Sequence, residues 1–349
     1  MRLLLTGASG FVGSHVLAHL LTHTDAEIVC PWTLRHRGNS QRVAAALDQS
    51  LDTAPDRSAW NERVITVMHD LATPIPATLA REIGLVDYVL NLASESHVDR
   101  SIATPASFIR NNVEIMLNVL DYARQVRPRM LLQMGTDEEY GPAPDGYAHR
   151  EWDTVLPSNP YSASKAAQSA IATAYWRTYG VPLVLTRTMN LIGPGQDGEK
   201  FVPMVIRRVL AGETVPIHSS PDGEPGSRHW IDARELGSAW LHLMRTTVPE
   251  MYPEHDRPSM WHIVGAERSN LEIAQTIADI LGKPLHYELV SFHASRPGHD
   301  LRYALDGSKL AAAGWTPSRP LEQTLADIVA WYLDHPTWLT PTEEAAHAL

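Results

Sequence analysis

Residues 2–13 read RLLLTGASGFVG, an apolar run that leads into three closely spaced glycines. Helical periodicity follows over residues 16–21. The pattern therefore predicts a strand, a glycine turn and a helix. Gly7, Gly10 and Gly13 let the backbone approach a pyrophosphate, whose charge the unpaired N–H groups at the start of the helix would stabilise. An ordinary turn between a strand and a helix is the alternative.

Strand patterns alternate with helical patterns through the first half of the chain. Strands are expected at residues 27–30, 64–68, 86–92, 130–134 and 181–186, and helices at residues 105–126 and 161–179. This alternation predicts an α/β fold with a doubly wound parallel sheet, the Rossmann arrangement.

Glycine and proline become frequent after Thr188, which marks a second, smaller α/β lobe. We expect a first domain at 1–188 that binds a nicotinamide and a second at 189–349 that binds the substrate. Residues 260–264 read as a strand that could rejoin the main sheet, so the segment 232–265 is expected to return to the first domain.

Composition and charge exclude several functions. The chain of 349 residues is 44% hydrophobic and 20% charged, which is typical of a soluble globular protein. Its 29 basic and 40 acidic residues give a net charge of −11, which argues against unaided binding to nucleic acid or to an anionic membrane. The single Cys30 fits a reducing compartment, and no apolar run approaches the roughly 20 residues of a membrane span. We expect a cytoplasmic protein with no signal peptide and no metal.

The end of the second strand bears on the type of dinucleotide. An acidic residue usually binds the ribose 2′-OH of NAD here, but the sequence places Arg35 and Arg37 at this point. Either arginine could pair with the 2′-phosphate of NADP, or both could lie in a solvated loop and contact nothing. Asp70, after the third strand, could accept from the adenine amino group or cap a turn.

Two polar motifs follow later strands. Residues 133–141 read QMGTDEEYG, with Asp137 and Glu138 adjacent, and Tyr161 and Lys165 stand four residues apart, on one face of a helix. A tyrosine with a pKa of about 10 is a poor base at neutral pH. We expect the lysine and a positive nicotinamide to lower that pKa.

Six motifs in order carry a family resemblance over nearly the whole chain: TGASGFVG, LASESHVDRS, GTDEEYG, YSASK, NLIGPGQDGEKFVP and RPGHDLRY. They resemble the extended short-chain dehydrogenase/reductase superfamily and, within it, the dTDP-glucose 4,6-dehydratase family. The glycine loop and the Tyr-x-x-x-Lys pair are shared across that superfamily. The triplet Thr136–Glu138 is more discriminating, because related epimerases and decarboxylases usually have Ser or Thr at position 137.

The resemblance implies a reaction with a tightly bound NAD or NADP that is recycled in each turnover. Tyr161, assisted by Lys165 and Thr136, would take the proton of the C4 hydroxyl while hydride leaves C4. Glu138 would then remove the C5 proton while a protonated Asp137 donates to the departing C6 hydroxyl. Hydride return to C6 would give a nucleoside-diphosphate 4-keto-6-deoxyhexose. One carboxyl must therefore be neutral while its neighbour is ionised.

The resemblance also implies binding residues. For the dinucleotide these are Gly7, Gly10, Phe11, Gly13, Arg35, Arg37, Asp70, Leu71, Ala93, Tyr161 and Lys165. For the nucleoside-diphosphate sugar these are Ser96, His97, Asn190, Lys200, Phe201, Arg228 and Arg296, with residues 189–194 expected to form a substrate loop. His97 could equally be a loop histidine whose hydrogen bonds are internal. A homodimer is expected, paired through the helices from Pro105 and from Tyr161.

Three positions depart from the family pattern: Gly135, Glu139 in place of an aliphatic residue, and His229 in place of Asp. The carboxylate of Glu139 could perturb the acidic pair or face solvent. Successive strand side chains point to opposite faces, so Asp137 and Glu138 reach one substrate only if the backbone turns there.

Other functions stay open at this point. A sugar-nucleotide 4-epimerase or decarboxylase of the same superfamily, or an inactive cofactor-sensing protein, would have the same fold, and the acidic pair could be a solvated turn. The arginines at 35 and 37 favour NADP and the GDP-mannose branch, whereas LASESHVDRS, TDE and RPGHD favour the dTDP-glucose branch.

Overall fold

The computed structural model describes residues 1–33, 35, 38–51, 62–291 and 301–341. Its largest sheet has seven parallel strands in the order β10-β6-β5-β4-β1-β2-β3. These strands are β1 (Arg2–Thr6), β2 (Glu27–Trp32), β3 (Val64–Met68), β4 (Tyr88–Asn91), β5 (Met130–Thr136), β6 (Leu183–Thr188) and β10 (Ser259–Ile263). The expected doubly wound parallel sheet is confirmed.

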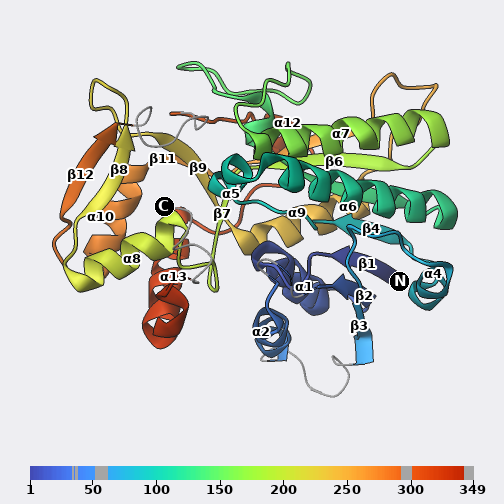
Figure 1. Cartoon of the computed structure of the whole chain (residues 1–349), viewed down its shortest axis with the longest axis horizontal. Helices are drawn as coiled ribbons and strands as arrows, with labels where there is room; N and C mark the ends of the chain where they lie inside the picture. The colour runs from blue at the N-terminus through green and yellow to red at the C-terminus, as the bar shows by residue number, and fades with distance from the viewer. Residues whose placement is uncertain (34, 36–37, 52–61, 292–300, 342–349) are drawn as a thin grey trace.

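Helices cover both faces of this sheet because its central strands are apolar on both sides. In β1, Leu3 and Leu5 pack with the helices of one face and Leu4 with those of the other, and all three are 0% exposed. One face carries α1 (Phe11–His23), α2 (Ser40–Leu51) and α9 (Ala233–Thr246), and the other carries α4 (Ala77–Ile83), α6 (Pro105–Val126) and α7 (Pro160–Tyr179). Figure 1 shows α6 and α7 side by side along the upper face. Each helix layer buries a separate apolar cluster against the sheet.

The strand order reverses between β1 and β4. The chain builds β2 and β3 on one side of β1 and then places β4 and β5 on the other. The connections that leave the carboxyl ends of β1 and β4 therefore run to opposite faces of the sheet, and the crevice between them is where open α/β sheets bind ligands. The short helix α5 (Val98–Ala103) begins just beyond β4 at this end of the sheet.

The second lobe has its own core (left in Figure 1). A three-stranded sheet has the order β11-β9-β7, and β8 pairs with β12 in parallel. Its elements are β7 (Asn190–Ile192), α8 (Phe201–Ala211), β8 (Val215–Ser219), β9 (Ser227–Asp232), β11 (Ala266–Ser269), α10 (Asn270–Ile280), β12 (Tyr287–Ser291), α13 (Leu321–Asp334) and the 3-10 helix η2 (Pro336–Leu339). Between β9 and β11 the chain returns to the main sheet, where β10 pairs with β6, and α12 (Ser308–Ala312) later packs near β10.

One expectation from the sequence is wrong at the start of this lobe. Residues 189–194 were expected to form a loop, but Asn190–Ile192 form strand β7, paired in parallel with β9. The strand forms because Leu191 and Ile192 are buried, at 7% and 1% exposed. Further along, Ser269 and Glu272 form a capping box that starts α10. In the part of the chain described here, no helix is long and apolar enough to cross a membrane.

Candidate active site

A cavity of about 250 Å³ lies at the carboxyl end of the main sheet. It extends from the glycine loop after β1 to Met134 and Gly135 of β5, and a loop of the second lobe forms its remaining wall. Thr136, Asp137 and Glu138, which follow Gly135, are not among the lining residues. The expected binding residues that line it are Gly7, Gly10, Phe11, Gly13, Arg35, Asp70, Leu71, Ala93, Ser96, His97, Tyr161, Lys165 and Lys200. Arg37 and Arg296 lie outside the described residues. The cavity thus gathers residues expected for the dinucleotide and part of those expected for the sugar nucleotide.

The glycine loop closes tightly under the start of α1. Gly7 has φ +73, in the left-handed region that favours glycine, and its carbonyl accepts from Gly10 N at 2.9 Å. A Cβ on Gly13 would lie 2.0 Å from the carbonyl oxygen of Gly7. Helix α1 has no side-chain cap, so its first N–H groups remain for a ligand in the cavity. Loop and helix terminus together fit a dinucleotide pyrophosphate.

At the far end of the cavity, Arg35 forms an ion pair with Asp70. Asp70 also caps a turn, since its Oδ1 accepts from Ala72 N at 3.0 Å. The turn-capping alternative is therefore present. The alternative in which the arginines contact nothing is wrong for Arg35.

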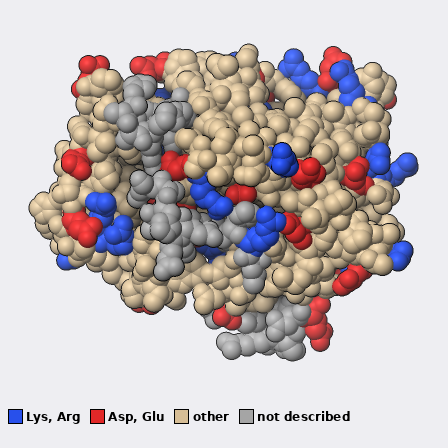
Figure 2. Space-filling view, viewed as in Figure 1, with Lys and Arg blue, Asp and Glu red and all other residues tan. Residues whose placement is uncertain are grey.

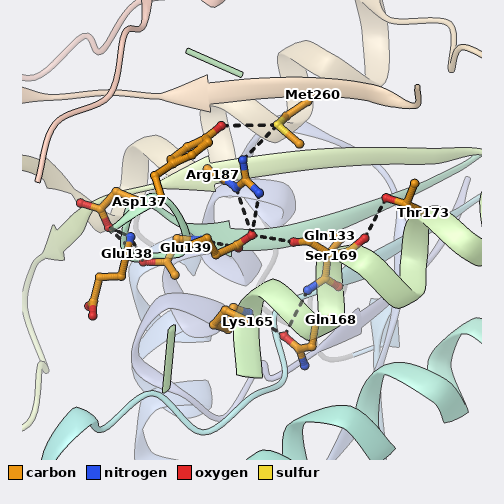
Figure 3. Close-up of polar contacts among 12 residues, drawn as sticks. Gln133, Asp137, Glu138, Glu139, Lys165, Gln168, Ser169, Thr173, Arg187 and Met260 are labelled. Atoms are coloured by element: carbon orange, nitrogen blue, oxygen red, sulfur yellow. Dashed lines mark hydrogen bonds and ion pairs between the residues drawn. The ribbon is translucent and has the colours of Figure 1, made fainter. Parts of the chain in front are cut away.

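The backbone turns at the end of β5, as a shared role for the two carboxylates requires. Thr136 ends the strand, and residues 137–140 form the 3-10 helix η1 (Asp137–Tyr140). We call residues 136–140 the acidic turn. Oδ1 of Asp137 accepts from Thr136 Oγ1 at 2.9 Å and from Glu138 N at 3.0 Å. Figure 3 shows Asp137 and Glu138 on one side of this turn and Glu139 on the other.

Burial controls the ionisation of the groups around this turn. Asp137 is 5% exposed, and burial raises its pKa to about 6, although the hydrogen bond from Thr136 and the charge of Arg228 oppose the shift. Burial lowers the pKa of Lys165 to about 8, opposed by the charge of Glu139. A carboxyl with a pKa near 6 holds its proton in roughly one molecule in ten at pH 7, far more often than an ordinary aspartic acid does.

The pKa of Tyr161 differs from the expectation. Burial and then the charge of Glu138 raise it above its usual value, while a hydrogen bond with Thr136 lowers it. Lys165 does not offset the rise, because its Nζ donates to Met134 O at 2.7 Å and to Gln168 Oε1 at 2.8 Å. The expected lowering therefore needs the positive charge of a nicotinamide in addition to the lysine.

Asn159 joins the acidic turn to the helix of Tyr161, and sequence reasoning missed it. Its Nδ2 donates to Glu138 Oε2 at 3.2 Å, and its Oδ1 accepts from Ser162 N at 2.9 Å to cap α7. The signal was present in the sequence, because Asn followed by Pro is a common start of a helix.

The residues expected to bind the sugar nucleotide do not all gather in the cavity. Asn190, Phe201 and Arg228 lie outside its lining. Phe201 begins α8 and packs on Trp230, with ring centroids 5.8 Å apart, whereas Nδ2 of Asn190 is buried with no hydrogen-bond partner among the described residues. Arg228 on β9 donates to Ser227 O at 2.7 Å and to Leu301 O at 2.6 Å.

The two histidines left open by the sequence both have internal partners. Nδ1 of His97 accepts from Arg100 N at 3.3 Å, and its Nε2 lies 3.1 Å from Glu199 across the cavity. Nδ1 of His229 donates to Gly265 O at 3.1 Å, and its Nε2 lies 3.5 Å from Glu267. His97 is thus a helix cap that also faces the cavity.

Comparison with known proteins gives consistent matches over the whole chain. The family model described as "NAD dependent epimerase/dehydratase family" matches residues 3–253. The dTDP-glucose 4,6-dehydratase 1 of Escherichia coli K12 is 31% identical over 374 residues, covering 99% of this chain and 97% of that protein. The low-salt glycan biosynthesis protein Agl12 of Haloferax volcanii is 33% identical, covering 95% and 99%.

A solved structure adds the three-dimensional match. The dTDP-glucose 4,6-dehydratase DesIV from Streptomyces venezuelae, solved with NAD bound, has a TM-score of 0.81. It is 32% identical in sequence, and the match covers 97% of this chain and 98% of that one. The resemblance stated from the six motifs is confirmed.

Proposed function

We propose a specific reaction from one premise, which is that the chain belongs to the NAD-dependent epimerase/dehydratase family. Its most similar relatives include several dTDP-glucose 4,6-dehydratases, so it is a sugar-nucleotide enzyme that uses NAD or NADP. The proposed reaction converts a nucleoside-diphosphate hexose into the nucleoside-diphosphate 4-keto-6-deoxyhexose with loss of water.

The acidic turn carries this proposal. An epimerase needs no acid for a leaving hydroxyl, whereas a dehydratase needs one neutral and one ionised carboxyl side by side. Burial of Asp137 raises its pKa to about 6, and Glu138 beside it accepts from Asn159 Nδ2 at 3.2 Å. This difference in surroundings supports Asp137 as the acid and Glu138 as the base.

Each step then has a residue of this chain to move its proton. The glycine loop and the first N–H groups of α1 would hold the dinucleotide, which would supply the hydride exchange with C4 and C6. Tyr161, hydrogen-bonded to Thr136, takes the C4 hydroxyl proton, and Lys165 in the same helix supplies positive charge. Glu138 removes the C5 proton, and Asp137 protonates the C6 hydroxyl as it leaves as water. When hydride reaches C6, Glu138 returns its proton to C5, and the proton taken by Tyr161 passes through solvent to replace the one lost from Asp137. The nucleoside diphosphate is unchanged in the reaction, and the net change is the loss of one water molecule from the hexose.

The second lobe is proposed to bind the nucleoside diphosphate. Asn190 offers a buried Nδ2 without a partner among the described residues, and Lys200 lines the cavity. Arg228 adds positive charge near the acidic turn, since its charge lowers the pKa of Asp137. Arg296 retains its proposed diphosphate role from the family resemblance alone. We keep the proposed division at 1–188 and 189–349, with 232–265 returning to the first domain.

A homodimer through α6 and α7 is part of the proposal. The two helices lie side by side on one face of the sheet (Figure 1), so a second copy would form a four-helix contact there. Analytical ultracentrifugation is expected to show a dimer. A monomer at the concentrations used for assays would contradict this point.

The reaction is tested by incubating the purified protein with dTDP-, UDP-, GDP- and CDP-hexoses and following loss of water by mass spectrometry. We expect one of them to lose water. If none does while one is epimerised or decarboxylated, the dehydratase assignment is wrong. Denaturing the same sample and identifying the released dinucleotide decides between NAD and NADP.

A further inference from the structure

Glu139 extends from the acidic turn on the side opposite to Asp137 and Glu138 (Figure 3). Its side chain is 0% exposed, so the expectation that it could face solvent is wrong. Oε2 accepts from Arg187 Nε at 3.0 Å, from Arg187 Nη2 at 2.8 Å and from Ser169 Oγ at 2.9 Å. One carboxylate thus connects the turn to β6 and to α7.

The other oxygen of Glu139 closes the turn on itself. Oε1 accepts from the backbone N of Thr136 at 3.1 Å, which completes a capping box around η1. Because Asp137 and Glu138 lie between Thr136 and Glu139, this bond holds both ends of the segment that carries them.

Arg187 is as enclosed as its partner. It is 3% exposed, and its guanidinium lies over the Tyr140 ring at 4.1 Å while Nη1 contacts Met260 Sδ at 3.4 Å. Among the described residues, Arg187 forms its ion pair with Glu139. Loss of one partner from such a pair leaves a buried, unpaired charge, so the two residues act as a unit.

Gly135 belongs to the same arrangement. It pairs with Arg187 in the β5–β6 register, and a Cβ at this position would lie 2.5 Å from Glu139 Oε1. The two departures from the family pattern in this stretch therefore have one explanation, because the missing side chain at 135 makes room for the carboxylate at 139.

We propose that Glu139 and Arg187 are positioning residues that hold Asp137 and Glu138 at the substrate, so that water elimination depends on this ion pair more than C4 oxidation does. The inference rests on the proposed function. Tyr161 and Lys165 lie on α7, which keeps contacts that do not involve the acidic turn: Asn159 Oδ1 accepts from Ser162 N, and Lys165 donates to Met134 O and Gln168. A displaced acidic turn therefore moves the two carboxylates first.

The test separates the two steps in the purified holoenzyme with dTDP-glucose, or with the panel hexose that loses water. C4 oxidation is followed by the absorbance of the reduced nicotinamide in a single turnover, and elimination by mass spectrometry. The variants are Glu139→Gln and Arg187→Lys. Arg187→Lys keeps both charges of the ion pair, so the charge of Glu139 still raises the pKa of Lys165. It loses the two hydrogen bonds that Nε and Nη2 of Arg187 donate to the Glu139 carboxylate.

Glu235→Gln is the matched control. Glu235 lies in α9, away from the acidic turn, and is also buried, at 2% exposed. Its carboxylate accepts hydrogen bonds from Ser318 and Arg319. All proteins are compared at a pH well below the Lys165 pKa of about 8, so that the lysine stays protonated.

We expect elimination to fall about 10–100-fold more than oxidation in both test variants, with reduced nicotinamide accumulating, because a small misplacement of a reacting group costs that much. In Glu235→Gln the ratio of the two steps should stay unchanged. Equal losses in both steps, or no loss, would overturn the inference while leaving the proposed function intact. If Glu139→Gln does not fold, Arg187→Lys alone decides. Absence of water loss in the unaltered protein would instead overturn the proposed function and this inference with it.

Discussion

At the scale of single residues, the acidic turn shows how an unusual residue can depend on another one nearby. Gly135 and Glu139 are separated by four positions, and the carboxylate of one occupies the volume that a side chain on the other would need. Neither departure is explained alone, because a glycine in a strand interior weakens it and a buried glutamate requires partners.

The first prediction tests this dependence with Gly135→Ala. The new Cβ would lie 2.5 Å from Glu139 Oε1 and 3.1 Å from both Arg187 Cγ and Thr186 O. We expect a loss of roughly 1–3 kcal/mol in the free energy of unfolding from overpacking. The loss should be smaller in a Glu139→Ala background, where the nearest atom is absent. Urea denaturation of the four proteins measures the coupling, and additive effects would contradict it.

The second prediction concerns Asp137→Asn. Burial raises the folded-state pKa of this carboxyl to about 6 from 3.8. Between these values the folded protein retains a proton that the unfolded chain has released, so stability falls as pH rises and the full penalty is present above about pH 6. The amide avoids this penalty and can still accept the same hydrogen bonds.

Asp137→Asn should therefore raise the free energy of unfolding at neutral pH by roughly 2–3 kcal/mol, while elimination is lost. The gain should shrink as the pH is lowered toward 3.8. Chemical denaturation across this pH range measures it, with the exposed Asp145→Asn as the control that stays unchanged. A variant that is less stable at neutral pH would contradict the assignment of a buried, proton-retaining carboxyl.

At the scale of elements, the loop of residues 193–200 belongs to the second lobe but forms part of the cavity wall, through Gln196, Asp197, Glu199 and Lys200. Arg42 on α2 anchors it: Nε donates to Gly195 O at 3.0 Å and Nη2 to Asp197 Oδ1 at 2.9 Å. The same guanidinium lies 5.3 Å from the Trp338 ring of η2. The helix α2 and the 3-10 helix η2 therefore hold this loop over the cavity.

The third prediction follows from that anchor. Arg42→Gln removes charge-assisted bonds worth about 1.5–3 kcal/mol each, so we expect the bound dinucleotide to dissociate about tenfold faster or more. The dinucleotide retained by the purified protein after repeated gel filtration, read from its absorbance, measures this effect. Arg63→Gln is the control, because Arg63 donates to Leu21 O and Thr24 O away from this loop. Equal retention in both variants would show that the loop does not hold the dinucleotide.

At the scale of the whole molecule, the two lobes share the chain in an interleaved order. Helix α9 covers the main sheet with Trp240, which is 0% exposed and donates to Thr186 Oγ1 at 3.1 Å. Strand β10 then covers the edge of β6. On the face shown in Figure 2, basic and acidic side chains are interspersed rather than gathered by sign. With a net charge of −11, an anionic substrate therefore depends on cations of the site, such as Lys165, Lys200 and Arg228.

The fourth prediction is that residues 1–188 do not fold stably as an isolated fragment. Without α9 and β10, the apolar face around Leu3, Leu20 and Val184 loses its cover, and β6 becomes an exposed edge strand. We expect aggregation or the absence of a cooperative thermal transition by circular dichroism, against a cooperative transition for the full chain. Cooperative melting of the fragment would show that the first domain is independent of the return segment.

Local pattern was enough to predict the sheet and the glycine turn. Strand and helix periodicity and the requirement for glycine act over a few neighbouring residues, so the sequence displays them directly. Strands β8 and β9 of the second lobe have no such local signal, and β7 lies where the sequence predicts a loop, because short strands form where a distant partner pairs with them. Helix α8 is not among the predicted helices.

By itself, then, the sequence determined the fold class and the family, and it supplied Asp137–Glu138 and Tyr161–Lys165 as candidates for the proposed site, since each motif consists of residues close together in the chain. Only the tertiary structure decided the state of those groups. The partner of Glu139 lies 48 positions away at Arg187, and that of Arg42 lies 155 positions away at Asp197. Burial raised the pKa of Asp137 and made Glu139 an ion-pair partner rather than a surface residue. Contacts between distant positions and removal from water depend on how the elements pack, and no local pattern records that packing.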